Sequence, residues 1–344
     1  MRTYFLLSLL SSSLFADSGG APRIFGGGGL VDKALNPALS ANAQVLQSAG
    51  TTAADKGLTL QEVEAMMSAS VDSYFYSNLV FSLKGNGALG IKEAYASTLS
   101  LPWVTLKGGK FLVDFGKNNP IHAHAQPVIG RPIVAASLLG TEGLSSVGLQ
   151  TSVLAPTPWT FDIKAALMRA EGALAFNSPN AEAVFGVARM EHLFDVGDSL
   201  SLGLGGSLAG GGNVFRKSNY LWGADLTVKY FLGKGRGDFA IAWVTEYILK
   251  QTDTGAAKVE DSGLYSSLVF RLSQKYWLGT RMDSFLSSGN VKTTAENLFV
   301  AYVPSESSAL RLQGGLLQRT AASNGWQLLL QYNMAIGSHQ GHGF

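Results

Sequence analysis

The segment 326–336, with the sequence WQLLLQYNMAI, alternates between two kinds of side chain over its whole length. The large apolar positions are Trp326, Leu328, Leu330, Tyr332, Met334 and Ile336. The positions between them are mostly polar or small: Gln327, Leu329, Gln331, Asn333 and Ala335. A period of two residues is that of a β-strand, in which successive side chains point to opposite faces. The segment is therefore predicted to be a strand with one apolar and one mostly polar face.

Many other segments share this alternation. It is clear in residues 220–230, where Asp225 and Lys229 oppose an apolar face, and in residues 239–249, where Glu246 does so. Further strands are predicted at 39–47, 90–99, 103–113, 145–154, 159–170, 183–193, 200–209, 263–272, 276–285, 297–303 and 309–318. Residues 60–67 have helical propensity, but the sequence after them favours an extended chain. Together these segments predict about 16 strands, within a range of about 12 to 18.

The composition indicates which solvent the apolar faces meet. Apolar residues make up 46% of the chain, charged residues only 15%, and Gly occupies 41 positions. Beyond the N-terminal leader, the chain has no run of about 20 apolar residues that would suit a membrane-spanning helix. Trp, Tyr and Leu instead fill whole faces of most predicted strands, as expected for lipid on one side and water on the other. We therefore predict an all-β fold, a transmembrane antiparallel β-barrel with a water-filled lumen. A soluble β-sandwich or β-helix is the alternative.

The N-terminus has the pattern of a secretory signal peptide. Arg2 precedes the apolar run 4–10, and the small residue Ala16 precedes Asp17. We predict a signal peptide at 1–16, a flexible Gly-rich arm at 17–38 and the barrel over 39–344. An uncleaved anchor helix is the alternative, but the apolar run is shorter than a bilayer requires. An exported barrel implies the outer membrane of a Gram-negative bacterium.

Several function classes are disfavoured. The formal net charge of +2 is too small to indicate a nucleic-acid partner, and the absence of Cys removes thiol nucleophiles and cysteine metal sites. The GxGxxG match at residues 85–90 precedes a predicted strand and not a helix, so it indicates a hairpin turn instead of a dinucleotide site. No GxSxG elbow precedes a predicted helix. We expect no enzyme and no cofactor, with an outer-membrane barrel hydrolase as a minor alternative.

The polar faces of the predicted strands carry charges of both signs. The lumen-lining candidates are Asp162, Lys164, Asp225, Lys229, Asp238, Glu246, Arg271, Arg281, Asp283 and Arg311. Because rings of one sign select ions, this mixture predicts weak or locally set selectivity. Alternatively, each charge pairs across strands and stiffens the wall.

The longest gap between predicted strands covers residues 116–144. Its apolar content argues against disorder, and loops of this length are commonly functional. We hypothesise that it folds back into the lumen and narrows it. That hypothesis places five pore-constriction candidates on the solute path: Lys117, His122, His124, Arg131 and Glu142. An extracellular cap is the alternative.

His122 and His124 also suggest a metal site, because imidazole is the commonest metal ligand. The two side chains point to one side only if the backbone between them is extended. A third ligand would come from a distant part of the sequence, and His339 and His342 are the candidates considered.

Several motifs resemble those of a known family. They lie at residues 91–95, 101–102, 107–111, 114–124, 131–132, 140–144, 147–150, 304–306 and 310–313. Here the chain resembles a family of uncharacterised bacterial outer-membrane porin-like barrels, most densely over 91–150. Members are variously described as porins or as zinc-regulated, TonB-dependent receptors. The family tends to have Pro between the two histidines, where this chain has Ala123. A TonB-dependent receptor also needs a plug domain and about 22 strands, so active transport is not expected.

The sequence as a whole predicts a passive diffusion channel for small polar solutes or ions. The alternative is a specific uptake channel or receptor for a metal ion or metal chelate. The expected partners are outer-membrane lipid, the transported solutes and the barrel-assembly machinery, for which the signal is expected at residues 332–336. A homo-oligomer is expected only by analogy with trimeric porins.

Overall fold

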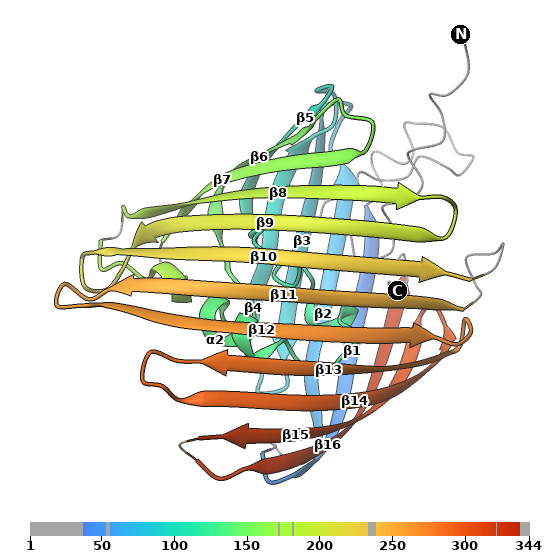
Figure 1. Cartoon of the computed structure of the whole chain (residues 1–344). Helices are drawn as coiled ribbons and strands as arrows, with labels where there is room; N and C mark the ends of the chain where they lie inside the picture. Colours follow the sequence, from blue (N-terminus) through green and yellow to red (C-terminus); the bar gives the residue numbers. More distant parts are fainter. Residues whose placement is uncertain are drawn as a thin grey trace.

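The computed structural model describes residues 37–52, 56–170, 173–180, 182–232, 239–320 and 322–337. Sixteen antiparallel strands form one closed barrel, in which each strand pairs with its neighbours in sequence and β1 also pairs with β16 (Figure 1). This confirms the predicted barrel class and strand number. The proposed signal peptide and nearly all of the proposed arm lie outside the described residues.

The strands and short helices follow one another in a simple up-and-down order. They are β1 (Ala38–Gly50), β2 (Gly57–Ser70), β3 (Phe75–Lys84), β4 (Leu89–Thr98), β5 (Val104–Leu112), η2 (Ala123–Ala125), α2 (Ile133–Leu139), β6 (Ser145–Leu154), β7 (Thr160–Arg169), η3 (Leu174–Phe176), β8 (Val184–Val196), β9 (Leu200–Gly212), β10 (Ser218–Phe231), β11 (Ala240–Asp253), β12 (Lys258–Arg271), β13 (Tyr276–Leu286), β14 (Lys292–Ser305), β15 (Ser308–Arg319) and β16 (Gly325–Gly337).

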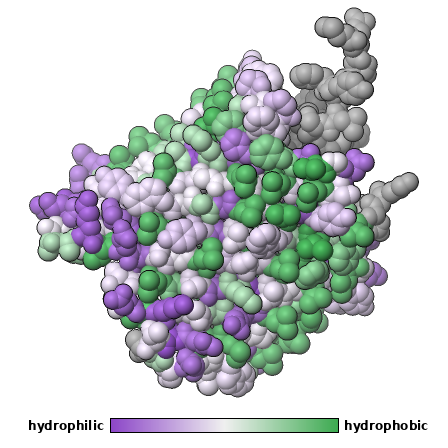
Figure 2. Space-filling model, viewed as in Figure 1, coloured by the Kyte–Doolittle hydropathy of each residue, from purple (hydrophilic) through white to green (hydrophobic). Residues whose placement is uncertain are grey.

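The alternation in the sequence determines which side chains point to the outside of the barrel and which point to its interior. In β16, Tyr332 is 42% exposed, whereas its neighbours Gln331 and Asn333 are 2% and 0% exposed. The large apolar side chains therefore point outward and the polar ones inward. Figure 2 shows apolar side chains spread over the outer surface, with hydrophilic ones gathered at the left rim. A bilayer-spanning barrel requires this division between its faces.

Strand β2 contains the segment whose helical propensity conflicted with its pattern. Residues 60–67 are extended because β2 pairs with β1 on one side and β3 on the other. Such pairing overrides local propensity. The GxGxxG match at 85–90 spans the turn between β3 and β4, where Gly87 has a φ of 83° that suits Gly. The expected hairpin is therefore observed there.

The connection between β5 and β6, residues 113–144, contains elements that the sequence did not predict. The sequence predicts no regular element in the gap 116–144, but the structure has the 3-10 turn η2 and the seven-residue helix α2 there. Pro132 precedes α2 with a φ of −53°, close to a helical value. The buried residues of α2, which lie on one helical face, are Val134, Ala135, Leu138 and Leu139.

An apolar core lies within one side of the barrel. Helix α2 and the turn η3 both contribute to it, together with Phe115 and with side chains from the wall such as Ile248. The ring of Phe176 in η3 stacks on Phe185 of β8 with their centroids 4.6 Å apart. Among the described residues, no helix is long and apolar enough to cross a membrane.

Candidate functional site

Residues 113–144, here called the inward segment, cross the interior of the barrel. The first contacts are with the wall at β8 to β11. The Gly116 N–H donates to Ser207 Oγ at 3.0 Å, and the Asn118 N–H donates to Glu246 Oε2 at 3.1 Å. Lys117 forms an ion pair of 2.7 Å with Glu191 of β8. This end of the inward segment is thus tied to the wall through both backbone and side chain.

The middle of the inward segment contacts β13 and β15. The Ile129 N–H donates to Gln313 Oε1 at 2.7 Å, and Arg281 Nη1 donates to the Gly130 carbonyl at 2.8 Å. The Ile133 N–H, at the start of α2, donates to Asp283 Oδ1 at 3.0 Å. A helix leaves its first N–H groups without partners in the helix, so Asp283 satisfies one of them from the wall.

The part around η2 reaches the side of the barrel opposite β8. Arg311 of β15 donates to the carbonyls of Gln126 and His124, and Asn333 of β16 donates to His124 O at 3.2 Å. In a closed barrel of sixteen strands, β8 and β16 lie across from each other. The inward segment therefore spans the interior from wall to wall.

Two residues shape the inward segment locally. Gly116 has a φ of 63°, which suits Gly, and a Cβ there would lie 1.7 Å from Glu246 Oε1, so any larger residue would displace the Glu246 side chain. Arg131 donates to the carbonyls of Asn118 at 3.1 Å and of Ile121 at 2.9 Å, and also to that of Glu142. The planar guanidinium thus holds together parts of the inward segment that are distant in sequence.

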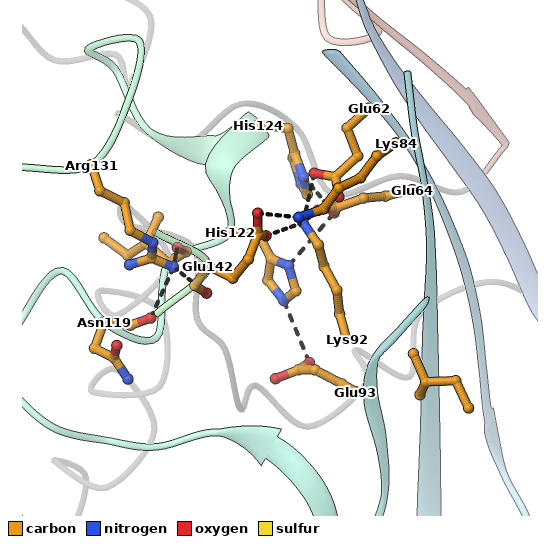
Figure 3. A network of polar contacts seen from close by, with 12 residues as sticks. Glu62, Glu64, Lys84, Lys92, Glu93, Asn119, His122, His124, Arg131 and Glu142 are labelled. Carbon is orange, nitrogen blue, oxygen red and sulfur yellow. Dashed lines mark hydrogen bonds and ion pairs between the residues drawn. The ribbon is translucent and has the colours of Figure 1, made fainter. Parts of the chain in front are cut away.

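His122 and His124 face a carboxylate on β2. His124 Nδ1 lies 2.8 Å from Glu64 Oε2, and His122 Nδ1 lies 3.5 Å from the same oxygen. The other ring nitrogen of His122, Nε2, lies 3.4 Å from Glu93 Oε2 on β4. Figure 3 shows His122 between these two carboxylates. The expected pair of histidines on one side is present, with ring centroids 5.7 Å apart.

A lysine balances the negative charge of this cluster. Lys92 Nζ contacts Glu64 Oε1, and it lies 2.6 Å from Glu62 Oε2 and 3.4 Å from Glu142 Oε2. Glu142 also pairs with Lys84 at 2.8 Å. Figure 3 shows the four carboxylates gathered around the two lysines and His122. The arrangement brings β2, β3 and β4 into contact with the inward segment.

The charge of His122 follows from its surroundings. Burial alone would lower the pKa of His122, but hydrogen bonds and charges from Glu64 and Glu93 outweigh burial and raise that pKa to about 10. The two carboxylates therefore favour the protonated form of His122.

The predicted lumen-lining residues that the structure describes lie on the inner side of the wall, and many are paired. Asp225 accepts from Arg189 at 2.7 Å, Arg281 and Asp283 lie 2.8 Å apart, and Lys164 lies 3.4 Å from both Asp162 and Asp114. Lys229, Glu246, Arg271 and Arg311 are also buried on this side. Asp238 lies outside the described residues.

The sequence reasoning missed the acidic cluster on β2 and β4. A register shift in each of these strands leaves one residue without a partner in the neighbouring strand: Gln61 in β2 and Lys92 in β4. Gln61 therefore points to the inner face together with Glu62, and Lys92 does so together with Glu93. A strict period of two cannot indicate such bulges. The pattern Glu62-Val63-Glu64 was the available signal. His339 and His342, considered as third ligands, lie outside the described residues.

Comparison with known proteins extends the structural description. No family model matches the sequence. An uncharacterised protein of Aquifex aeolicus is 27% identical over 340 residues, which cover 84% of this chain and 70% of that protein.

Solved structures with a similar fold include bacterial proteins described as porins or as outer-membrane proteins. OprB of Pseudomonas putida has a TM-score of 0.66 at 10% identity, covering 89% of this chain and 95% of OprB. The anion-selective porin from Comamonas acidovorans has a TM-score of 0.62 at 11% identity, covering 88% and 99%. The trimer form of OmpT, an outer-membrane protein of Vibrio cholerae, has a TM-score of 0.62 at 10% identity, with the same coverage. At these identities the likeness concerns the fold, which is that of a porin-like barrel.

Proposed function

We propose that this chain is an outer-membrane channel through which small polar solutes or ions diffuse passively. The observation that carries the proposal is a closed barrel with an apolar outer wall, a polar inner wall and a segment that crosses its interior. An apolar outer wall suits lipid, and a polar inner wall suits water. The fold shared with outer-membrane porins supports the same conclusion.

The inward segment would set the size limit of this channel. It contacts the wall on opposite sides, and its backbone is held by buried side chains such as Glu246 and Gln313. Lys117, His122, His124, Arg131 and Glu142 all belong to it. A solute passing through would have to pass between this segment and the remaining wall.

The inner charges support weak overall selectivity. Half of the predicted lining residues form ion pairs, as Asp225 does with Arg189, so the fields of these pairs largely cancel at a distance. A local preference for ions of one sign would come from the acidic cluster beside β2 and from Arg281 on β13 and Arg311 on β15. We also propose outer-membrane lipid as the environment and a homo-oligomer as the assembly, since one protein of this fold is described as a trimer.

Single-channel recording in planar bilayers tests the proposal. Protein refolded in detergent and stripped of metal with EDTA should give stable open steps, and the reversal potential in a KCl gradient should be small. Heat-denatured protein is the control for detergent artefacts. Folded protein, verified by its β circular dichroism, that gives no steps would contradict the channel function.

A further inference from the structure

We propose that Glu64, His122 and His124 form a binding site for one divalent transition-metal ion. One ligand atom from each residue lies within 4.8 Å of the others. The two histidines come from the inward segment and Glu64 from β2. A bound ion would therefore fasten the inward segment to the wall. Metal binding at this site does not depend on the proposed channel function. Only the expected effect of the ion on conductance rests on that function.

The distances between the ligand atoms suit a small ion. Glu64 Oε2 lies 2.8 Å from His124 Nδ1 and 3.5 Å from His122 Nδ1. In a tetrahedral zinc site with bonds of about 2.0–2.1 Å, two ligand atoms lie roughly 3.3 Å apart. Shifts of about half an ångström would therefore bring each nitrogen to that distance from the carboxylate oxygen, and the ligand atoms of the two histidines already lie within 4.8 Å of each other.

The backbone presents the two imidazoles together. His122 has an extended conformation, with φ −64° and ψ 152°, immediately before the η2 turn that contains His124. The two rings are stacked with an angle of 29° between their planes. Their Nδ1 atoms consequently approach the same oxygen of Glu64.

The surroundings supply the outer contacts that metal-binding histidines usually make. With His122 Nδ1 directed to the ion, Nε2 faces Glu93 at 3.4 Å. A carboxylate in this position orients the ring and makes the ligand more basic. Lys92 contacts Glu64 through Oε1 and leaves Oε2 on the side of the histidines. The two oxygens of Glu64 thus have separate partners.

The donor set defines the class of ion. Two imidazole nitrogens and one carboxylate oxygen favour Zn²⁺ and its neighbours such as Ni²⁺, whereas Ca²⁺ and Mg²⁺ prefer oxygen ligands alone. Three protein ligands leave a fourth position for water. Imidazole coordinates a metal ion only when deprotonated, so the affinity of the site for the ion should fall at low pH.

Metal titration of the refolded full chain tests the site directly. EDTA-stripped protein in detergent should bind Zn²⁺ with a stoichiometry near one by isothermal titration calorimetry, and the variants His124→Ala and Glu64→Gln should lose at least about tenfold in affinity. Glu93→Ala, which removes the outer contact of His122, should lose about 10- to 100-fold. Circular dichroism and heat-dependent gel migration verify that each variant is folded.

Two control variants separate this site from other histidines. His192 lies on the outer face of β8, stacked on Phe161 with centroids 4.1 Å apart, so His192→Ala should bind Zn²⁺ as the unaltered protein does. The double variant His339→Ala, His342→Ala should also bind normally. Loss of binding in that double variant, or equal binding by folded His124→Ala and unaltered protein, would overturn the assignment. So would folded protein that binds no Zn²⁺.

Conductance distinguishes the two proposals. If a bound ion fastens the inward segment, Zn²⁺ should change the open-state conductance of the unaltered channel and leave His124→Ala unchanged. Channel steps in EDTA without any Zn²⁺ binding would contradict the metal site alone. One bound Zn²⁺ in a protein that never conducts would contradict the channel alone.

Discussion

The inward segment is held in the barrel by two different kinds of contact. Helix α2 packs through buried apolar side chains such as Leu139, whereas the run from 116 to 131 is held by hydrogen bonds and ion pairs with wall residues such as Glu246 and Arg311. Apolar packing depends on shape and burial, and salt or metal ions affect it little. Contacts between charges depend strongly on what else binds there. The comparison indicates that the inward segment is fixed at α2, whereas its position near η2 should respond to ions.

The largest effect on stability is expected at helix α2. Leu139→Ala removes a fully buried side chain from the core and should lower the free energy of unfolding by about 2–5 kcal/mol. Denaturant unfolding in detergent micelles, followed by Trp fluorescence, measures this. The matched control is Val214→Ala in an exposed turn, where a change within about 0.5 kcal/mol is expected. Equal effects of the two substitutions would mean that α2 does not anchor the inward segment.

An intermediate effect is expected at Arg131. Arg131→Lys keeps the charge but loses the fork that joins the carbonyls of Asn118, Ile121 and Glu142, and should cost about 1.5–3 kcal/mol. Channel steps should also become noisier, because the inward segment loses its internal clamp. The control is Arg216→Lys in an exposed turn. If Arg131→Lys has the same stability and the same channel noise as the unaltered protein, a positive charge alone is enough to hold the inward segment at this position.

The smallest effect is expected at the exposed ion pair between Lys84 and Glu142, whose side chains are 41% and 50% exposed. Lys84→Ala should cost about 0.2–1 kcal/mol at neutral pH. Burial would raise the pKa of Glu142, but the hydrogen bond from Lys84 and the charge of Lys92 lower it below 4.5. The stabilisation of the fold by this ion pair is therefore fully present above pH 4.5 and is lost as the pH falls through the lowered pKa of Glu142.

Unfolding curves of the unaltered protein and Lys84→Ala at pH 7 and pH 3 measure this dependence. The difference between the two proteins should shrink at pH 3. A difference that stays constant with pH would assign the effect to the lost side-chain packing of Lys84.

The sequence predicted the strands of the barrel wall far better than the structure of the segment inside the barrel. Alternation gave the bounds of β6 as 145–154 and the outward face of β16, because each position in a strand has only two environments. The bulges at Gln61 and Lys92 interrupt that rule, so the cluster around Glu64 was missed. The meeting of Glu64 with His124 depends on the path of the chain through the interior, which local pattern does not specify. Helix α2 was missed because seven residues are too short for a clear helical period.

The pairing of β1 with β16 has a consequence for biogenesis. The strand synthesised first has no partner on one side until the strand synthesised last is available. Until that seam closes, a row of backbone N–H and C=O groups remains open to water or to another chain, and lipid cannot satisfy them. A nascent chain that ends before β16 would keep this seam open, so membrane insertion has to wait for nearly the whole polypeptide.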